Sequence, residues 1–321
     1  MIGSAHADIL IGKDDRNVLR GEGGADALYG EGGDDELEGG AGGDELYGDA
    51  GFDYASYKTA PVGVLVYLDG SGPGGGHAQG DHLDRIEGVI GSAFGDSFVG
   101  DTQRNVLRGG GGSDNLYGRE GNDTLQGEGG IDYLDGGAGN DELRGGAGND
   151  TVTYVLGGEG VVVDLAAGTA TGGASIGSDH LSGIENVFGT SYDDRLAGNA
   201  GANRLEGEEG ADELVGRDGA DRFYYHNRYD SMPTLPDHIL DFNRSQGDKI
   251  DLARVDANER APGNEAFQFV GQAGFTGAGQ LRFFQQGAHT IVEANTDGTG
   301  GAEMRIVLDP LVSLQGTDFL L

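Results

Sequence analysis

The chain has 321 residues, of which 66 are glycine, and its 55 acidic residues outnumber its 20 basic residues to give a formal net charge of −35. A surface this acidic excludes nucleic acid as the main partner, because phosphates require a basic surface. The absence of cysteine excludes disulfide bonds. No segment reaches the roughly 18 apolar residues of a transmembrane helix, and the N-terminus lacks the basic-then-apolar pattern of a cleaved signal peptide.

Nine-residue units occupy three phased blocks within the first 224 residues. Residues 3–56 hold six units, residues 91–153 hold seven and residues 189–224 hold four. Each follows the pattern G-G-x-G-x-D-x-U-x, in which U is a large apolar residue; the one small residue at that position is Ala55. The same pattern is a known calcium-binding β-helix repeat.

Each unit predicts a turn followed by a minimal strand. The first six residues are too rich in glycine for a helix or a strand interior, and glycine permits the positive φ angles of tight turns. The last three form a strand whose central residue points inward, because side chains alternate along a strand. Two units then make one coil of a parallel β-solenoid, with coils stacked about 4.8 Å apart.

The sixth position of each unit is Asp or Asn, and these residues are the candidate metal ligands, which we call the ladder residues. Stacking places the sixth position of each unit over the sixth position of the unit two further along the chain. Two carboxylates placed there would repel each other. Calcium suits this gap because it accepts about six to eight oxygen ligands. The ladder residues are Asp8, Asn17, Asp26, Asp35, Asp44, Asp53, Asp96, Asn105, Asp114, Asp123, Asp132, Asp141, Asp150, Asp194, Asn203, Asp212 and Asp221.

The stacked pairs predict several calcium ions, up to about eleven. Asn stands in the second unit of every block, and the sites that contain it lose one formal charge, so we expect them to be the weakest. A disordered Gly/Asp-rich tract has no reason to preserve a nine-residue phase. We therefore expect disorder only in the absence of calcium.

Two inserts separate the blocks, at residues 57–90 and 154–188, and they resemble each other. GVLVYLDG at 63–70 matches GVVVDLAA at 160–167, and a second strand follows in each. We expect wider coils of the same solenoid, with separate binding modules as the alternative. His82, His180 and His238 each follow Asp and precede an apolar residue. We expect these histidines to face solvent without forming a shared zinc site.

The nonapeptide phase ends before the last region, residues 225–321. Short apolar runs predict antiparallel strands that cover the last coil of the solenoid. These runs are at 238–242, 249–252, 267–270, 281–284, 290–294 and 304–308.

The whole chain resembles the RTX, or hemolysin-type calcium-binding, proteins, since residues 3–224 match their nonapeptide. Residues 237–321 resemble the domain that follows the repeats in serralysin metalloproteases. The motifs that carry this resemblance are DHILDFNRSQGDKIDLARVDA at 237–257, GQLRFFQQGAHTIVEAN at 279–295 and DFLL at 318–321. The resemblance implies an all-β protein that forms a parallel β-roll with wider-coil inserts and a C-terminal antiparallel β capping region.

The resemblance also implies a secreted, extracellular protein exported by a type I secretion exporter. In the family an uncleaved C-terminal signal ends in an acidic residue followed by apolar residues. Here that role would fall to Asp318, Phe319, Leu320 and Leu321, with an ordinary last strand as the alternative. Folding would then be triggered by extracellular calcium after export.

No catalytic constellation is apparent, so we do not expect an enzyme within this chain. The HExxH zinc motif of serralysins is absent. GDSF at 95–98 resembles a hydrolase signature, but its Asp96 is already a ladder residue. Two alternatives stay open: a calcium-dependent module that binds polysaccharide or matrix, and the C-terminal part of a larger secreted enzyme or toxin. The chain begins inside a repeat, so an upstream domain or a partner at that end also stays open.

Overall fold

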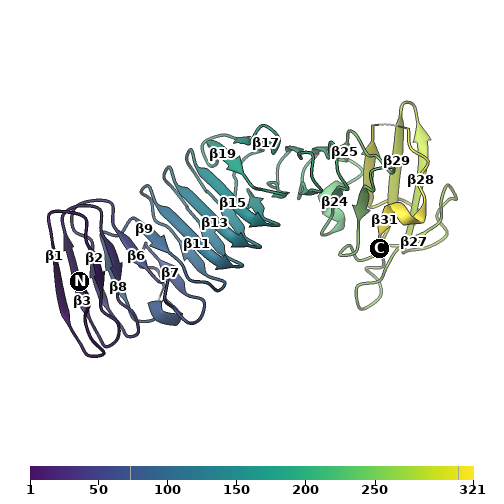
Figure 1. The fold of residues 1–321 in the computed structure, drawn as a ribbon. Helices are drawn as coiled ribbons and strands as arrows, with labels where there is room; N and C mark the ends of the chain where they lie inside the picture. Colours follow the sequence, from purple (N-terminus) through teal and green to yellow (C-terminus); the bar gives the residue numbers. More distant parts are fainter. Residues whose placement is uncertain (73, 310) are drawn as a thin grey trace. The chain divides into compact units, whose positions relative to one another are not determined.

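The computed structural model describes residues 1–72, 74–309 and 311–321. The described residues are nearly all β-structure and form two compact units (Figure 1). The first unit comprises residues 1–152 and 176–184, and the second comprises 153–175 and 185–321. The helices of the described chain are single 3₁₀ turns, η1 (Gly76–Ala78), η2 (Arg228–Ser231) and η3 (Gly316–Asp318). None of them is long and apolar enough to span a membrane.

The first unit contains three parallel sheets. Alternate repeats place their strands on alternate sides of each coil, so each sheet is built from every second strand of a block. One sheet has the order β1 (Ile9–Lys13), β3 (Ala27–Glu31), β5 (Glu45–Tyr47), β8 (His82–Asp84). The longest is β2 (Val18–Arg20), β4 (Glu36–Glu38), β6 (Tyr54–Ser56), β9 (Gly88–Ile90), β11 (Val106–Gly112), β13 (Thr124–Gly130), β15 (Glu142–Gly148), β19 (Ser178–Ser182). The third is β7 (Leu65–Tyr67), β10 (Ser97–Val99), β12 (Asn115–Tyr117), β14 (Tyr133–Asp135), β16 (Thr151–Thr153).

The register of these sheets gives the predicted two-unit coil. Leu10 pairs with Leu28, and Leu28 with Leu46, each 18 positions apart in the chain. The position-eight side chains point inward and are almost fully buried, from Leu10 to Phe223. Gly24 shows why the turns need glycine: its φ is +118°, and a Cβ there would lie 2.6 Å from the backbone of His6 in the adjacent coil. The parallel β-roll predicted from the repeats is confirmed.

The inserts contribute strands to these same sheets. In the first insert, β8 pairs in parallel with β5 and places Leu83 beside Leu46, while β9 continues the sheet of β6. In the second insert, β19 pairs with β15, and β17 (Val162–Asp164) forms an antiparallel hairpin with β18 (Thr169–Thr171). β8, β9 and β19 therefore keep the parallel register of the coils that precede them, whereas the β17–β18 hairpin adds one antiparallel pair.

The second unit begins with parallel coils and ends in an antiparallel sheet. One sheet has the order β17, β21 (Arg195–Ala197), β23 (Glu213–Val215), β25 (Asp237–Ile239), β30 (Met304–Leu308), β29 (His289–Asn295), β28 (Gln280–Gln286), β27 (Gln268–Phe269). The other is β20 (Asn186–Phe188), β22 (Arg204–Glu206), β24 (Arg222–Tyr224), β26 (Lys249–Asp251), β31 (Phe319–Leu320).

The antiparallel region is smaller than the sequence suggested. Only β28, β29 and β30 pair antiparallel among the strands expected there. β25, β26 and β27 all pair in parallel instead. The reason for β25 and β26 is that each has a buried apolar residue, Ile239 and Ile250, stacked on the preceding coil at Leu214 and Phe223. They continue the solenoid after the nonapeptide pattern has ended.

Candidate metal centres

One carboxylate oxygen of most ladder Asp residues accepts a hydrogen bond from the backbone of the preceding coil. Oδ1 of Asp26 accepts a hydrogen bond from the backbone N–H of Asp8 at 2.8 Å, and Oδ1 of Asp44 accepts from Asp26 at 2.9 Å. The same 18-residue contact recurs in the second and third blocks. The ladder residues thus stack in register, as the spacing predicts.

The second carboxylate oxygen of most ladder residues is buried without any hydrogen-bond partner. A buried anionic oxygen that lacks a partner is costly, and a hard cation removes that cost. The residues that share this feature are Asp26, Asp35, Asp44, Asp53, Asp114, Asp123, Asp132, Asp141, Asp212 and Asp221.

A glycine and a backbone carbonyl oxygen lie beside these carboxylate oxygens. A Cβ on Gly21 would lie 2.2 Å from Oδ2 of Asp26 and 2.6 Å from the carbonyl oxygen of Gly39 in the next coil. Gly118 relates in the same way to Asp123 and to the carbonyl of Gly136. The first glycine of the repeat therefore keeps open a space that a side chain would fill. Carboxylate and carbonyl oxygens at such a space are the ligands that calcium prefers.

The described residues contain no group of three or more His, Cys, Asp or Glu side chains that could hold a metal ion by themselves. On each edge of the roll, the ladder instead offers one Asp or Asn side chain per coil, with backbone carbonyls between coils. This donor set fits calcium, which accepts mixed carboxylate and carbonyl ligands. It does not fit ions that require several side-chain nitrogen or sulfur ligands.

Burial also changes the proton affinity of the ladder. Loss of solvent raises the pKa of both Asp114 and Asp123 to about 7. It raises the pKa of Asp53 and Asp141 to about 6. The charge of the adjacent carboxylate adds to the effect at Asp114, Asp123 and Asp53. The ladder without a cation is therefore poorly suited to carry its full negative charge.

The first ladder residue of each block is satisfied by its own turn. Oδ2 of Asp96 accepts from the backbone N–H of Ser92 at 2.6 Å, and Oδ1 accepts from the Ser92 hydroxyl at 3.0 Å. Thr190 donates to Asp194 in the same way, and Ser4 donates both its backbone N–H and its hydroxyl to Oδ2 of Asp8. A hydroxyl residue at position two of the unit thus replaces the cation at the start of a block.

The second ladder residue of each block is Asn, and its amide points a donor at the backbone. Nδ2 of Asn105 donates to the carbonyl of Glu87 at 3.3 Å, and Nδ2 of Asn203 donates to the carbonyl of Glu185 at 2.9 Å. Asn17 donates to the carbonyls of Lys13 and Asp15. The amide N–H occupies the direction in which an Asp would present an oxygen to a cation. That these Asn-containing sites are the weakest stays a prediction.

The ladder extends beyond the nonapeptides to five residues that the repeat pattern did not include. Each has a carboxylate oxygen that accepts the backbone N–H of the preceding ladder residue, at distances of 2.9 to 3.1 Å. A sequence signal was available, because an acidic residue stands two positions before an inward apolar residue in every case. The five residues are Asp81, Glu87, Asp179, Asp237 and Asp248.

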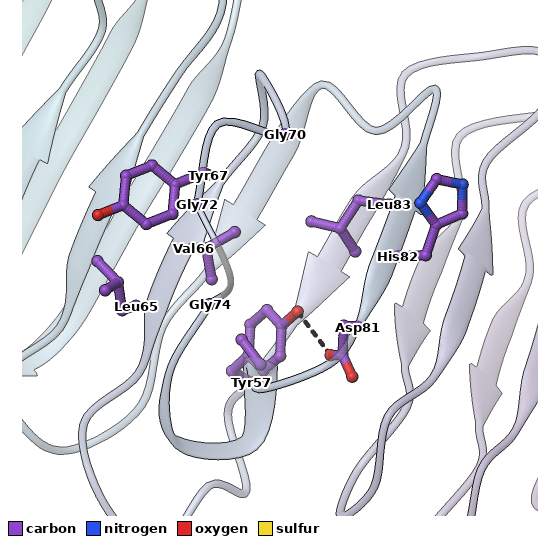
Figure 2. A pocket seen from close by; sticks show the side chains of 11 residues that line it. Tyr57, Leu65, Val66, Tyr67, Gly70, Gly72, Gly74, Asp81, His82 and Leu83 are labelled. Atoms are coloured by element: carbon purple, nitrogen blue, oxygen red, sulfur yellow. Dashed lines mark hydrogen bonds between the residues drawn. The ribbon is translucent and has the colours of Figure 1, made fainter.

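Asp81 differs from the repeat carboxylates because a side chain satisfies its second oxygen. The buried Tyr57 hydroxyl donates to Oδ2 of Asp81 at 3.0 Å, at the edge of a cavity of about 260 Å³ in the first insert (Figure 2). Desolvation raises the pKa of Asp81 to about 6 and that of Tyr57 well above its usual 10. Tyr57 at this ladder position provides a donor where the repeats leave an oxygen free.

Family models identify both parts of the chain. The RTX calcium-binding nonapeptide repeat matches in four copies, at residues 2–37, 26–55, 90–125 and 117–152. The model of the Peptidase M10 serralysin C terminal matches residues 159–320, which is half of the chain. The chain belongs to the serralysin C-terminal family and carries RTX calcium-binding repeats. The RTX repeats support calcium binding by this protein, and the two domain types indicate a secreted protein in a type I secretion context.

Solved structures include β-rich matches at low identity. The AlgE6R3 subunit of the Azotobacter vinelandii mannuronan C5-epimerase is 22% identical to this chain, with a TM-score of 0.20. The match spans 72% of this chain and 80% of the AlgE6R3 chain. The extracellular lipase LipA from Serratia marcescens is 15% identical to this chain, with a TM-score of 0.25. The match spans 71% of this chain and 40% of the LipA chain. No curated protein matches the RTX protein.

Replacing Asp123 by Asn should remove one calcium ion from the second block. The change keeps Oδ1 as an acceptor for Asn105 but removes the charge of the buried Oδ2. We expect about one ion fewer and, for that site, an affinity at least about tenfold lower. Calcium stoichiometry by native mass spectrometry measures this. Glu120→Gln, which removes an exposed charge, is the matched control, and equal effects of both variants would refute the assignment.

Replacing Asn105 by Asp should add a site while weakening the metal-free fold. The new carboxylate would face the Glu87 carbonyl, which the amide now donates to, so without calcium two acceptors would lie together. We expect about one additional bound ion and, in chelator at a pH where the metal-free chain still shows strand signal, a lower melting temperature. Gln103→Glu adds a charge at an exposed neighbour and should do neither. Unchanged stoichiometry in Asn105→Asp would show that the position cannot hold a ligand.

Protons should partly replace calcium. The pKa values of about 7 at Asp114 and Asp123 lie above the ordinary 3.8, so the metal-free folded chain binds more protons than the unfolded chain. This stabilisation is complete below the unfolded value and disappears as the pH rises through about 6 to 7. Far-UV circular dichroism of dilute protein in chelator should show strand signal near pH 4.5 and little near pH 8. Equal disorder at both values would contradict the prediction.

Proposed function

We propose that this secreted calcium-binding RTX protein stays unfolded until export and that extracellular calcium then triggers its folding. The observation that carries the proposal is the column of buried ladder carboxylates whose second oxygen has no partner within the protein, such as Asp44, Asp123 and Asp221. Without cations these groups repel each other and oppose the folded state. Ions that bind only the folded state shift the equilibrium toward folding by mass action.

The ladder residues act together in this proposal. Most of their carboxylates accept a hydrogen bond from the backbone of the preceding coil, so a coil that loses its ion also weakens the coil beside it. Each nonapeptide contributes only one inward apolar side chain, and a single coil cannot bury these side chains alone. Calcium and the stacking of coils therefore depend on each other, which favours a cooperative transition.

The C-terminal residues support export before folding. In the folded chain β31 pairs with β26, and Phe319 beside Ile250 is buried. The Asp318 carboxylate forms an ion pair with Arg244 at 2.6 Å. We propose that Asp318, Phe319, Leu320 and Leu321 form the uncleaved signal for the type I exporter. These residues would be accessible to the exporter only while the chain is unfolded.

The proposal assigns binding, and not catalysis, to the acidic residues of this chain. Asp96 of the GDSF segment is engaged by Ser92, Val64 and the ladder. The other buried acids of the nonapeptides stack in register as described above. We propose on these grounds that the ladder carboxylates serve as calcium ligands, with Asp237 extending the column into the C-terminal region.

A calcium titration tests the proposed function directly. We expect a cooperative coil-to-strand transition in far-UV circular dichroism in the high-micromolar to millimolar range, with about eight to eleven ions bound at saturation. Magnesium at the same concentration should fail, because it prefers a smaller octahedral set of ligands. A chain that is fully folded in excess chelator at neutral pH would refute calcium-triggered folding, although it would leave calcium binding intact.

A further inference from the structure

A recess on the outer face of the longest sheet in the first unit is lined by cations and carboxylates together. It is a cavity of about 340 Å³ beside β4, β6, β9 and β11, which pair in that order. Leu37, Ala55 and Leu107 of these strands point inward, so the residues next to them point outward. The polar side chains that line the recess include Arg16, Asp34, Glu36, Tyr54, Lys58 and Arg108.

The arginines of this recess have no carboxylate partner, although the chain is rich in carboxylates. Most arginines of the described residues form an ion pair, as Arg20 does with Glu38. Within the part of the chain that the structure describes, Arg16 and Arg108 form none, and Nε of Arg108 is shielded from solvent without a hydrogen-bond acceptor. A shielded donor without an acceptor is costly, so an anionic ligand would stabilise this arrangement.

Aromatic rings hold the guanidinium groups at this recess. The guanidinium carbon of Arg108 lies 5.6 Å from the ring centroid of Tyr54, and that of Arg104 lies 5.6 Å from the ring centroid of Phe52. The two rings are 5.4 Å apart between centroids. The ring of Tyr54 can extend across β9 because the residue there is Gly88, where a Cβ would lie 2.4 Å from the ring. Stacking positions a guanidinium without using its N–H donors, which stay available to a ligand.

Carboxylates beside these cations restrict which anion can enter. Oε1 of Glu36 accepts hydrogen bonds from Nζ of Lys58 at 2.9 Å and from the Ser56 hydroxyl at 3.3 Å. Oδ1 of Asp34 accepts from the backbone N–H of Phe52 at 2.9 Å. A ligand with many negative charges, such as an acidic peptide, would be repelled by these groups. A ligand with one anionic group and several hydroxyls is suited to the recess, because hydroxyls can donate to carboxylates.

We propose that this recess binds a uronate, the carboxylate-bearing sugar of an acidic glycan. The sugar carboxylate accepts hydrogen bonds from the guanidinium groups of Arg16 and Arg108, and the sugar hydroxyls donate to Glu36 and Asp34. The volume of about 340 Å³ lies near the lower end of the roughly 300–1,000 Å³ of ligand pockets. A recess of this size suits a single sugar ring with its substituents. Arg104, at the rim, is placed to contact the next unit of the glycan.

The recess exists only in the stacked roll. Arg16 precedes β2 and Arg108 lies on β11, more than 90 positions later in the chain, with Tyr54 of β6 between them. All three belong to the first unit. Binding therefore requires a folded roll, whatever drives its folding, so this inference does not depend on calcium-triggered folding.

The test uses the full chain in saturating calcium, with its strand content checked by circular dichroism. Isothermal titration calorimetry measures the binding of trigalacturonate, of free galacturonate and of the fully methyl-esterified trisaccharide, which is uncharged. We expect a Kd of about 1 mM or lower for trigalacturonate. Free galacturonate should bind at the same site more weakly, since only the glycan reaches Arg104. The ester should bind at least about tenfold more weakly than the acid, because it cannot form charge-assisted hydrogen bonds.

Substitutions locate the binding site. Arg16→Gln and Arg108→Gln should each weaken trigalacturonate binding by at least about tenfold, because each removes a charged donor to the carboxylate. Arg222→Gln is the matched control, since Arg222 is an exposed arginine of the second unit that forms no ion pair within the described residues. It makes the same change of charge and should leave the affinity unchanged.

Three results would overturn the proposal. One is a Kd above about 10 mM for trigalacturonate with the wild-type protein. Another is unchanged affinity in both Arg16→Gln and Arg108→Gln, which would mean that calcium ions link the glycan to the acidic surface. The third is tighter binding of tri-aspartate than of trigalacturonate, which would assign the recess to an acidic peptide. The comparison of acid with ester uses the wild-type protein and stands even where a variant fails to fold.

Discussion

The structure depends on one constraint: carboxylates at the same position of successive coils are buried in a column, and each has only one oxygen satisfied by the protein. Oδ1 is used by the adjacent backbone, as in the pair Asp114 and Asp96. Oδ2 of Asp114 is buried beside the glycine that begins its unit. The apolar stack of leucines inside the coils favours the same arrangement that brings the charges together. Hydrophobic stacking and charge repulsion therefore oppose each other until a cation is present.

At the ends of each column, hydrogen-bond donors of the protein satisfy the ladder residues in place of a cation. Ser4, Ser92 and Thr190 supply donors to the first ladder residue of their blocks, and an Asn supplies its own donor in the second. In the first insert Tyr57 does the same for Asp81. Hydroxyl and amide donors are fixed in the structure, whereas ions depend on the surrounding solution. Block boundaries can thus be satisfied in either condition, while under the proposed function the block interiors depend on the ion.

The C-terminal region combines two kinds of structure with different requirements. Asp237 and Asp248 extend the columns, and Ile239 and Ile250 extend the apolar stack, so the first part is still solenoid. The β28–β30 sheet has continuous backbone pairing and a buried apolar face that includes Leu281, Ile306 and Leu308. This sheet needs no cation within its strands. It gives the solenoid a neighbour whose stability comes from ordinary packing.

The sequence by itself determined the repeat unit, the inward residue, the 18-residue coil and the parallel roll, because each follows from a nine-residue period and from alternation along strands. It also placed the ladder residues in register. Which oxygens lack partners could not be predicted, because the answer depends on where Ser92, Thr190 and Tyr57 direct their donors in three dimensions. The extension of the ladder to Glu87 and Asp248, and the parallel pairing of β25 and β26, required contacts between residues more than 20 positions apart. The contacts of Asp309 with His238 and His289 were likewise decided only by the tertiary structure, since no local spacing brings these residues together.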